Sequence, residues 1–193
     1  MVRAKYLTKI TDINKMYIDK ILKEGDIVVD ATMGNGYDTK YLAEKVGSSG
    51  FVYSFDIQEE AISSTKKRLL ESNLENRVKL ILDGHENMGQ YVDEEVSCVL
   101  FNLGYLPGFK HMVVTKPQTT IKAIEASLKI LKPHGIVSIA IYTGHPGGED
   151  EKNSVYDFVS TLDQKEFNVL ESSFLNQINN PPRLILIEKK KIY

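Results

Sequence analysis

An acidic, glycine-containing segment directly after an apolar run is the part of the chain best suited to chemistry. Residues 30–39 read Asp-Ala-Thr-Met-Gly-Asn-Gly-Tyr-Asp-Thr and follow the apolar residues 27–29. A second apolar run, residues 52–55, ends in Asp56. At the mouth of a parallel sheet, glycines let the backbone approach a nucleoside, and an acidic residue ending the next strand binds two ribose hydroxyls. The spacing therefore predicts a site for a nucleoside-containing cofactor.

The residues after the glycines distinguish two kinds of cofactor. A dinucleotide needs an open, positive helix N-terminus for its pyrophosphate, and its usual fingerprint is G-x-G-x-x-G. Here Thr39 replaces the third glycine, and the Asp38 carboxylate would repel a phosphate. That carboxylate can instead hold the ammonium of a methionine moiety, with Asp30 as a second acceptor. These residues favour S-adenosylmethionine and a class I methyltransferase; a tight turn with a capping Asp is the alternative.

The end of the third predicted strand, residues 78–82, adds to the expected cofactor site. Asp83 follows it at the position that usually faces the adenine, where it is a candidate acceptor for the exocyclic amine. His85 fits a helix cap, an adenine neighbour or a solvated residue equally well. The predicted cofactor-binding residues are Asp30, Thr32, Met33, Gly34, Asn35, Gly36, Asp38, Thr39, Asp56, Ile57, Gln58, Asp83, Gly84, His85, Asn102 and Leu103.

The fourth predicted strand ends in groups suited to catalysis. Residues 102–108 read Asn-Leu-Gly-Tyr-Leu-Pro-Gly, at the switch point of a doubly wound sheet, where ligands bind. They resemble the Asn/Asp-Pro-Pro-Tyr/Phe pattern of methyltransferases that act on amino nitrogens. The Asn102 amide oxygen would accept a hydrogen bond from the target N–H and orient its lone pair, and Tyr105 would stack on a base. The alternative is a polar strand end followed by a Pro-Gly turn.

Two further loops are expected at the same rim of the sheet. Tyr142 and His145 follow the fifth strand, and His145 is the preferred candidate for proton handling. Residues 176–182 join the last two strands; both loops suit an acceptor pocket, but Gly, Asn and Pro also dominate ordinary turns. The predicted catalytic residues are Asn102, Tyr105, Tyr142 and His145. The predicted substrate-binding residues are Tyr105, Leu106, Pro107, Lys110, Asn176, Gln177, Asn180 and Pro181.

Apolar runs and helical patterns alternate along the chain and would position these residues. Helices are expected at 6–22, 37–46, 59–72, 85–91, 118–131 and 151–163, and strands at 27–31, 51–56, 78–82, 96–102, 136–142, 166–174 and 183–189. This predicts an α/β, Rossmann-like class I methyltransferase fold whose seven-stranded, mostly parallel sheet has an antiparallel last strand. We expect one domain over residues 1–193, with residues 1–25 as an N-terminal helical extension.

Composition limits the function classes. Cys98 is the single cysteine and lies in an apolar run, which excludes a disulfide framework and fits a reducing cytoplasm. We expect no membrane segment and no signal peptide, because the apolar stretches are too short. Four histidines without partners at ligand spacing predict no metal site. The net charge of −2 gives no global basic footprint, but RNA affinity depends on local phosphate contacts.

Basic residues gather in three places. The N-terminal segment carries Arg3 and five lysines up to Lys23, and two shorter clusters lie at residues 66–68 and 189–191. For each cluster taken alone, a solvated helix face or chain end is the favoured interpretation.

Four motifs in order resemble one family. They are Asp-Ala-Thr-x-Gly-Asn-Gly-x-Asp-Thr (30–39), Phe-Asp-Ile-Gln (55–58), Asn-Leu-Gly-Tyr-Leu-Pro (102–107) and Asn-Gln-x-Asn-x-Pro-Pro (176–182). They are similar to the small bacterial class I methyltransferases labelled rRNA methylases (YtqB-like, MnmM-type), over almost the whole chain. The resemblance implies S-adenosylmethionine-dependent methylation of 5-aminomethyl-2-thiouridine at the tRNA wobble position. The implied partner is the tRNA anticodon stem-loop.

At two places the sequence departs from the family pattern, which limits the residue roles that the resemblance implies for this chain. Relatives often carry Gly-Asp where this chain has Phe109-Lys110, so Lys110 is a candidate phosphate contact instead. Many have a His in the first helix where this chain has Lys15, and no role is carried over for it. rRNA or a small-molecule amine stays open as acceptor, and a non-catalytic cofactor- or RNA-binding protein is the rival from another class. The oligomeric state, a homodimer included, is open as well.

Overall fold

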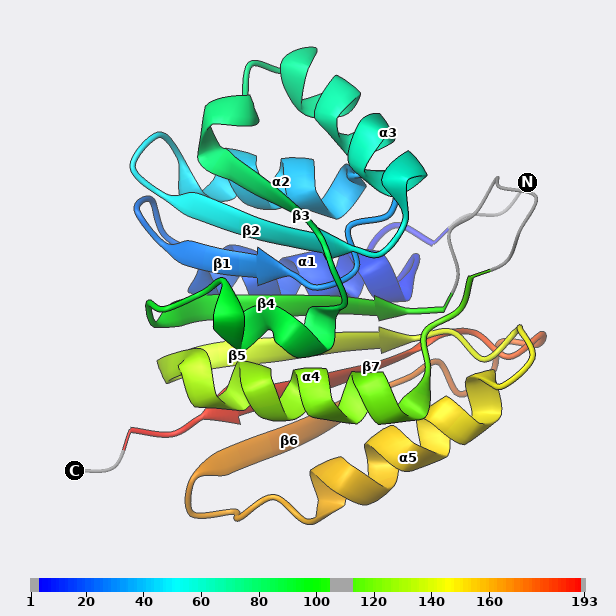
Figure 1. Ribbon diagram of the computed structural model, residues 1–193. Coiled ribbons are helices and arrows are strands. Elements are labelled where there is room, and N and C mark those ends of the chain that lie inside the picture. The colour runs from blue at the N-terminus through cyan, green and yellow to red at the C-terminus, as the bar shows by residue number, and fades with distance from the viewer. Residues whose placement is uncertain (1–3, 105–112, 192–193) are drawn as a thin grey trace.

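A seven-stranded sheet forms the centre of the computed structural model, which describes residues 4–104 and 113–191. Its strand order is β3-β2-β1-β4-β5-β7-β6 (Figure 1). The strands are β1 (Ile27–Asp30), β2 (Phe51–Asp56), β3 (Val78–Leu82), β4 (Val96–Leu103), β5 (Leu131–Ile141), β6 (Phe167–Ser172) and β7 (Arg183–Lys189). β7 runs antiparallel to both of its neighbours, β5 and β6. The pairs β1–β2, β1–β4, β2–β3 and β4–β5 are parallel. The predicted fold class is confirmed, with the switch point between β1 and β4.

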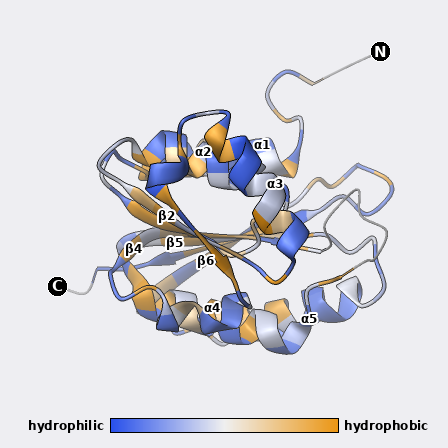
Figure 2. Ribbon diagram, turned by 45° about the horizontal axis from the view of Figure 1, so that its top comes forward, coloured by the Kyte–Doolittle hydropathy of each residue, from blue (hydrophilic) through white to orange (hydrophobic). Residues whose placement is uncertain are grey.

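Helices cover both faces of the sheet, as parallel strands require. One layer holds α1 (Ile10–Ile21), α2 (Tyr37–Val46) and α3 (Glu59–Leu70), and the other holds α4 (Pro117–Ile130) and α5 (Gly148–Ser160) (Figure 2). Two 3₁₀ turns, η1 (Glu75–Arg77) and η2 (His85–Gln90), flank β3. None of the helices within the described ranges is long and apolar enough to cross a bilayer.

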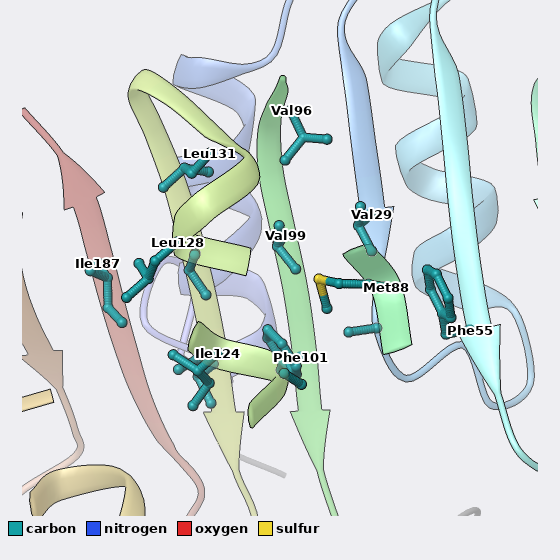
Figure 3. Packing of buried hydrophobic residues seen from close by; sticks show 14 of the residues in the cluster. Val29, Phe55, Met88, Val96, Val99, Phe101, Ile124, Leu128, Leu131 and Ile187 are labelled. Atoms are coloured by element: carbon teal, nitrogen blue, oxygen red, sulfur yellow. The ribbon is translucent and has the colours of Figure 1, made fainter. Parts of the chain in front are cut away.

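The larger core lies between the sheet and the α4 layer (Figure 3). Ile124 and Leu128 of α4 face the central strands, and Met88 of η2 packs beside Val29 and Phe55. Because β4 is covered on both faces, its residues 96–101 are all buried, which explains why they read as a continuous apolar run. The smaller core joins α1, α2 and α3 to the opposite face.

The N-terminal helix is part of the packed structure. Ile10 and Ile18 are almost fully buried, and α1 contacts β5 and β7. The Ser138 hydroxyl donates to the Asn14 side-chain oxygen at 2.7 Å, which joins α1 to β5. The helix begins at residue 10 rather than 6, and Tyr6, which precedes it, is 72% exposed.

The largest difference in an element boundary lies at the start of β5, whereas α5 begins and ends three residues earlier than expected. The strand begins at Leu131, inside the region expected to end the preceding helix, because Leu131 already pairs with Val96. The register then shifts between Val96 and Cys98, and His134 adopts a φ of 64° within the irregularity. The remaining elements follow the predicted order.

Candidate active site

A cavity of about 730 Å³ opens where the carboxyl ends of β1 to β5 meet the start of α4. This volume lies within the range of roughly 300–1,000 Å³ that is typical of small-molecule sites. The fold therefore brings the predicted strand ends together. The predicted residues that line the cavity are Thr32, Met33, Gly34, Asn35, Asp38, Asp56, Ile57, Gln58, Asp83, Gly84, His85, Asn102 and Tyr142.

The turn between β1 and α2 requires its glycines. Gly34 and Gly36 adopt φ values of 51° and 75°, which L side chains rarely adopt. A Cβ on Gly36 would also lie 2.6 Å from the Thr65 hydroxyl oxygen, so α3 leaves no room for one. The Thr65 hydroxyl donates to the Gly34 carbonyl at 3.1 Å, which holds the turn against α3.

Asp56 ends β2 and connects two segments of the cavity wall. Its Oδ2 accepts from the Gly34 N–H and its Oδ1 from the Gln58 N–H, each at 3.0 Å. Burial raises its pKa above the ordinary aspartate value. Hydrogen bonds from the Gly34, Gln58 and Ile57 backbone and from the Gln58 side chain oppose that rise. Asp56 thus fixes the glycine turn, and it lies on the cavity lining as the predicted acceptor for two ribose hydroxyls.

We expect Asp56→Ala to weaken S-adenosylhomocysteine binding by about 1–3 kcal/mol, because it removes a charged acceptor of hydrogen bonds. Isothermal titration calorimetry measures this directly. Glu94→Ala is a suitable control, since Glu94 accepts from the Tyr53 hydroxyl away from the cavity lining. Undiminished cofactor binding by the Asp56 variant would refute its assignment to the ribose.

Asp30 lies behind the cavity wall. Its carboxylate is fully buried and accepts from the Thr39 hydroxyl at 2.6 Å and from the Thr32 N–H at 3.2 Å. Burial, and next the nearby Asp38 carboxylate, raise the pKa of Asp30 to about 7. Within the described chain, Asp30, Gly36, Thr39 and Leu103 are predicted cofactor residues that do not line the cavity. The structure places them in the layer that supports its wall.

Asp38 and Asn102 meet inside the cavity. The Asn102 side-chain N–H donates to Asp38 Oδ2 at 2.9 Å, and the Asn102 backbone N–H donates to the Thr32 hydroxyl at 2.7 Å. Lys15 of α1 places its Nζ 3.9 Å from Asp38 Oδ1. Because the amide nitrogen faces Asp38, the amide oxygen must face the other way. No residue in the described ranges donates a hydrogen bond to that oxygen.

The end of β3 is held by local hydrogen bonds. Asp83 accepts from the Asn87 amide at 2.9 Å and from the Tyr91 hydroxyl at 2.8 Å, and these bonds lower its pKa. His85 is buried, and its Nδ1 donates to the Ala31 carbonyl at 3.1 Å. Burial lowers the pKa of His85, which favours the neutral ring. Of the alternatives for His85, a solvated residue is therefore wrong.

Tyr142 lines the cavity, whereas His145 does not. His145 is buried beside Gly104 and Gly148, and its Nδ1 donates to the Pro146 carbonyl at 3.1 Å. Burial, and next the Asp38 charge, raise the pKa of Tyr142, so its hydroxyl stays protonated near neutral pH.

None of the predicted substrate-binding residues that the structure describes lines the cavity. Asn176, Gln177 and Asn180 are exposed in the β6–β7 loop, Pro181 is half-buried there, and none of them lines the cavity in the described part of the chain. Tyr105, Leu106, Pro107 and Lys110 lie outside the described residues.

Several cavity residues were missed by sequence reasoning. Five of them, Ala31, Tyr37, Phe55, Glu86 and Gly104, lie within or next to recognised motifs, and that adjacency is the signal that could have found them. Thr11 comes from α1, which only the tertiary fold places here. The missed residues are Thr11, Ala31, Tyr37, Phe55, Glu86, Gly104, Val113, Val114, Thr115, Lys116 and Thr119.

Sequence reasoning also missed Glu151, which stabilises the segment of the cavity wall that directly precedes α4 in the chain. Its side chain is 1% exposed and accepts from the Thr115 and Thr120 hydroxyls, each at 2.6 Å. Thr115 lines the cavity, and its backbone N–H donates to the Gly104 carbonyl at 3.0 Å. The buried carboxylate thus ties this wall to α4 and α5.

The family model described as "Putative rRNA methylase" matches residues 52–188. The chain is also 36% identical over 192 residues to the chloroplastic tRNA (mnm(5)s(2)U34)-methyltransferase of Arabidopsis thaliana, covering 94% of this chain and 70% of that protein. The chain belongs to the rRNA methylase family. It is therefore a class I methyltransferase, and the predicted family is confirmed.

Solved structures agree with this family assignment. An rRNA methylase family structure from Clostridium thermocellum has a TM-score of 0.92 and 46% identity, covering 97% of this chain and 100% of that one. A methyltransferase from Streptococcus mutans in complex with SAH has a TM-score of 0.85 and 39% identity, covering 98% and 99%. The predicted cofactor, S-adenosylmethionine, is thus confirmed at the level of the family. Among the described residues, no group of three or more His, Cys, Asp or Glu could hold a metal ion.

Proposed function

We propose that this methyltransferase uses S-adenosylmethionine to methylate the aminomethyl nitrogen of 5-aminomethyl-2-thiouridine at the wobble position of tRNA. The observation that carries the proposal is the Asp38–Asn102 hydrogen bond, which turns an amide oxygen away from Asp38 within the cavity. The name of the Arabidopsis relative, a tRNA (mnm(5)s(2)U34)-methyltransferase, supports the choice of wobble uridine.

The cavity residues suit the cofactor. Asp38, Asp56, Asp83 and Glu86 line it, so it favours a ligand that carries an ammonium and a sulfonium. Asp56 would hold the ribose, Ile57 beside it offers an apolar surface, and the glycine turn lets the backbone approach. When bound, S-adenosylmethionine supplies an electrophilic methyl group.

The same residues suit an amine acceptor. Asn102 Oδ1 would accept a hydrogen bond from the acceptor N–H, which orients the nitrogen lone pair toward the methyl group. Tyr142 can donate or accept through a hydroxyl that remains neutral, but its raised pKa makes it a poor base. The proton that an aliphatic ammonium must lose would pass to water or to the Asp38 carboxylate. An anticodon loop presents unpaired bases, so no duplex need be opened.

Nucleoside mass spectrometry tests this proposal. tRNA from a strain that lacks the enzyme is analysed before and after incubation with this protein and S-adenosylmethionine. We expect one methyl group to be gained on 5-aminomethyl-2-thiouridine. If cofactor binding is intact but no methyl group is gained, the tRNA proposal is refuted, and rRNA and small amines become the substrates to test.

We also propose the broader setting of this activity. Residues 1–193 would act as one methyltransferase domain in the cytoplasm, where tRNA is a substrate. A homodimer stays a prediction that sedimentation analysis can test.

A further inference from the structure

Beside the cavity mouth, an arginine is held rigidly by two contacts. The guanidinium carbon of Arg68 in α3 lies 3.7 Å from the ring centroid of Tyr37, and its Nε donates to the Asn35 carbonyl at 2.8 Å. Both Tyr37 and Asn35 line the cavity, and Tyr37 is 65% exposed. A stacked and hydrogen-bonded guanidinium loses little further conformational entropy when it binds an anion.

No carboxylate in the described part of the chain pairs with Arg68. Among residues 4–104 and 113–191, no carboxylate lies within salt-bridge distance of it, whereas Arg183 pairs with Glu171 at 2.7 Å. Lys116 lies at the cavity from the opposite helical layer, also without a carboxylate at that distance in the described ranges. Two cations without a paired carboxylate in the described ranges, one from each helical layer, therefore lie on or against the cavity lining.

Neither cation has an evident role in binding the cofactor. The cavity lining between them carries four carboxylates, which suits a positively charged ligand. Lys116 on that lining and Arg68 stacked against it suit an acceptor that carries negative charge along its length, as the phosphates of a nucleic acid do. Arginine also matches phosphate oxygens with its planar fork of donors.

We propose that the Tyr37–Arg68 pair, with Lys116 across the opening, binds backbone phosphates of the RNA strand that flanks the acceptor nucleotide. This inference rests on the proposed RNA acceptor and goes beyond it by naming the contacts. Tyr37 holds the guanidinium plane, Arg68 contacts one phosphate, and Lys116 contacts a phosphate on the other side. The basic cluster at residues 66–68 is then more than a solvated helix face, because Arg68 turns toward the cavity mouth.

The test is the salt dependence of tRNA binding by the full-length protein. Fluorescence anisotropy with labelled tRNA is measured across a potassium chloride series for the wild type, Arg68→Gln and Arg77→Gln. Arg77 is the matched control, because it lies in η1 at the opposite end of β3 from the cavity. For Arg68→Gln we expect severalfold weaker binding and a slope of log K against log salt that is lower by about 0.7–0.9. Arg77→Gln should match the wild type.

Further measurements separate the competing explanations. Arg68→Lys should recover part of the affinity. The Arg68→Gln, Lys116→Gln double variant should reduce the slope of log K against log salt by about twice as much as Arg68→Gln alone. An unchanged slope for Arg68→Gln, or an equal change for Arg77→Gln, would overturn the inference. Weaker SAH binding by Arg68→Gln with unchanged tRNA binding would assign Arg68 to the methionine carboxylate and overturn it as well. Failure of the proposed function is seen separately, as absent methyl gain with the wild type.

Discussion

Replacing Asn102 with alanine should slow methyl transfer by about 100-fold or more, while SAH affinity stays within a few-fold of the wild type. The reason is geometric. Asn102 is held through its backbone by Thr32 and through its side-chain nitrogen by Asp38, so its oxygen is preorganised toward an acceptor. Single-turnover rates at saturating tRNA and cofactor measure the chemical step, and calorimetry measures cofactor binding.

Two further variants make this result interpretable. Asp38→Ala should reproduce much of the loss in rate, because the amide could then rotate and present its nitrogen. Asn168→Ala should leave the rate unchanged, since Asn168 is exposed on the edge strand β6. If the Asn102 variant kept wild-type turnover, the acceptor would be oriented by another group, and the role assigned to this amide would be wrong.

Alternation of apolar runs was enough to predict the sheet and the location of the site. The carboxyl ends of parallel strands meet at one edge of the sheet. Asp30, Asp56, Asp83 and Asn102 each lie at or beside such an end, so they were expected to come close together. Boundaries were less accurate where tertiary pairing decides them, as at Leu131, which joins β5 because Val96 lies beside it.

The detailed roles of the acidic residues could not be predicted, because they depend on which side chains face the cavity. Asp30 and Asp38 look alike in sequence, yet only Asp38 lines the cavity within the described residues, while Thr39 and Thr32 enclose Asp30. Glu151 shows the same limit. With Glu149 and Asp150 it resembles an acidic first turn that complements a helix dipole, but α4 packs over it and supplies a buried hydroxyl.

The buried Asp30 predicts an unusual pH dependence of stability. Its pKa is about 7 in the folded chain, against an ordinary value of 3.8. Between these values the folded state keeps a proton that the unfolded state releases, so the free energy of unfolding falls as pH rises. The loss contributed by this residue should approach about 4 kcal/mol near pH 7 and level off above it. Below pH 3.8 both states are protonated, and the contribution of Asp30 is fully present.

Urea unfolding of the cofactor-free protein between pH 5 and 8 measures this effect against Asp30→Asn. The amide cannot ionise, so the difference between the two proteins should change steadily up to pH 7, with the wild type relatively more stable at the acidic end. Titrating groups that do not interact with Asp30 contribute equally to both proteins and cancel in that difference. A difference that does not change with pH would show that Asp30 is ionised throughout. In that case the Thr39 and Thr32 hydrogen bonds would outweigh the cost of burial and the repulsion from Asp38.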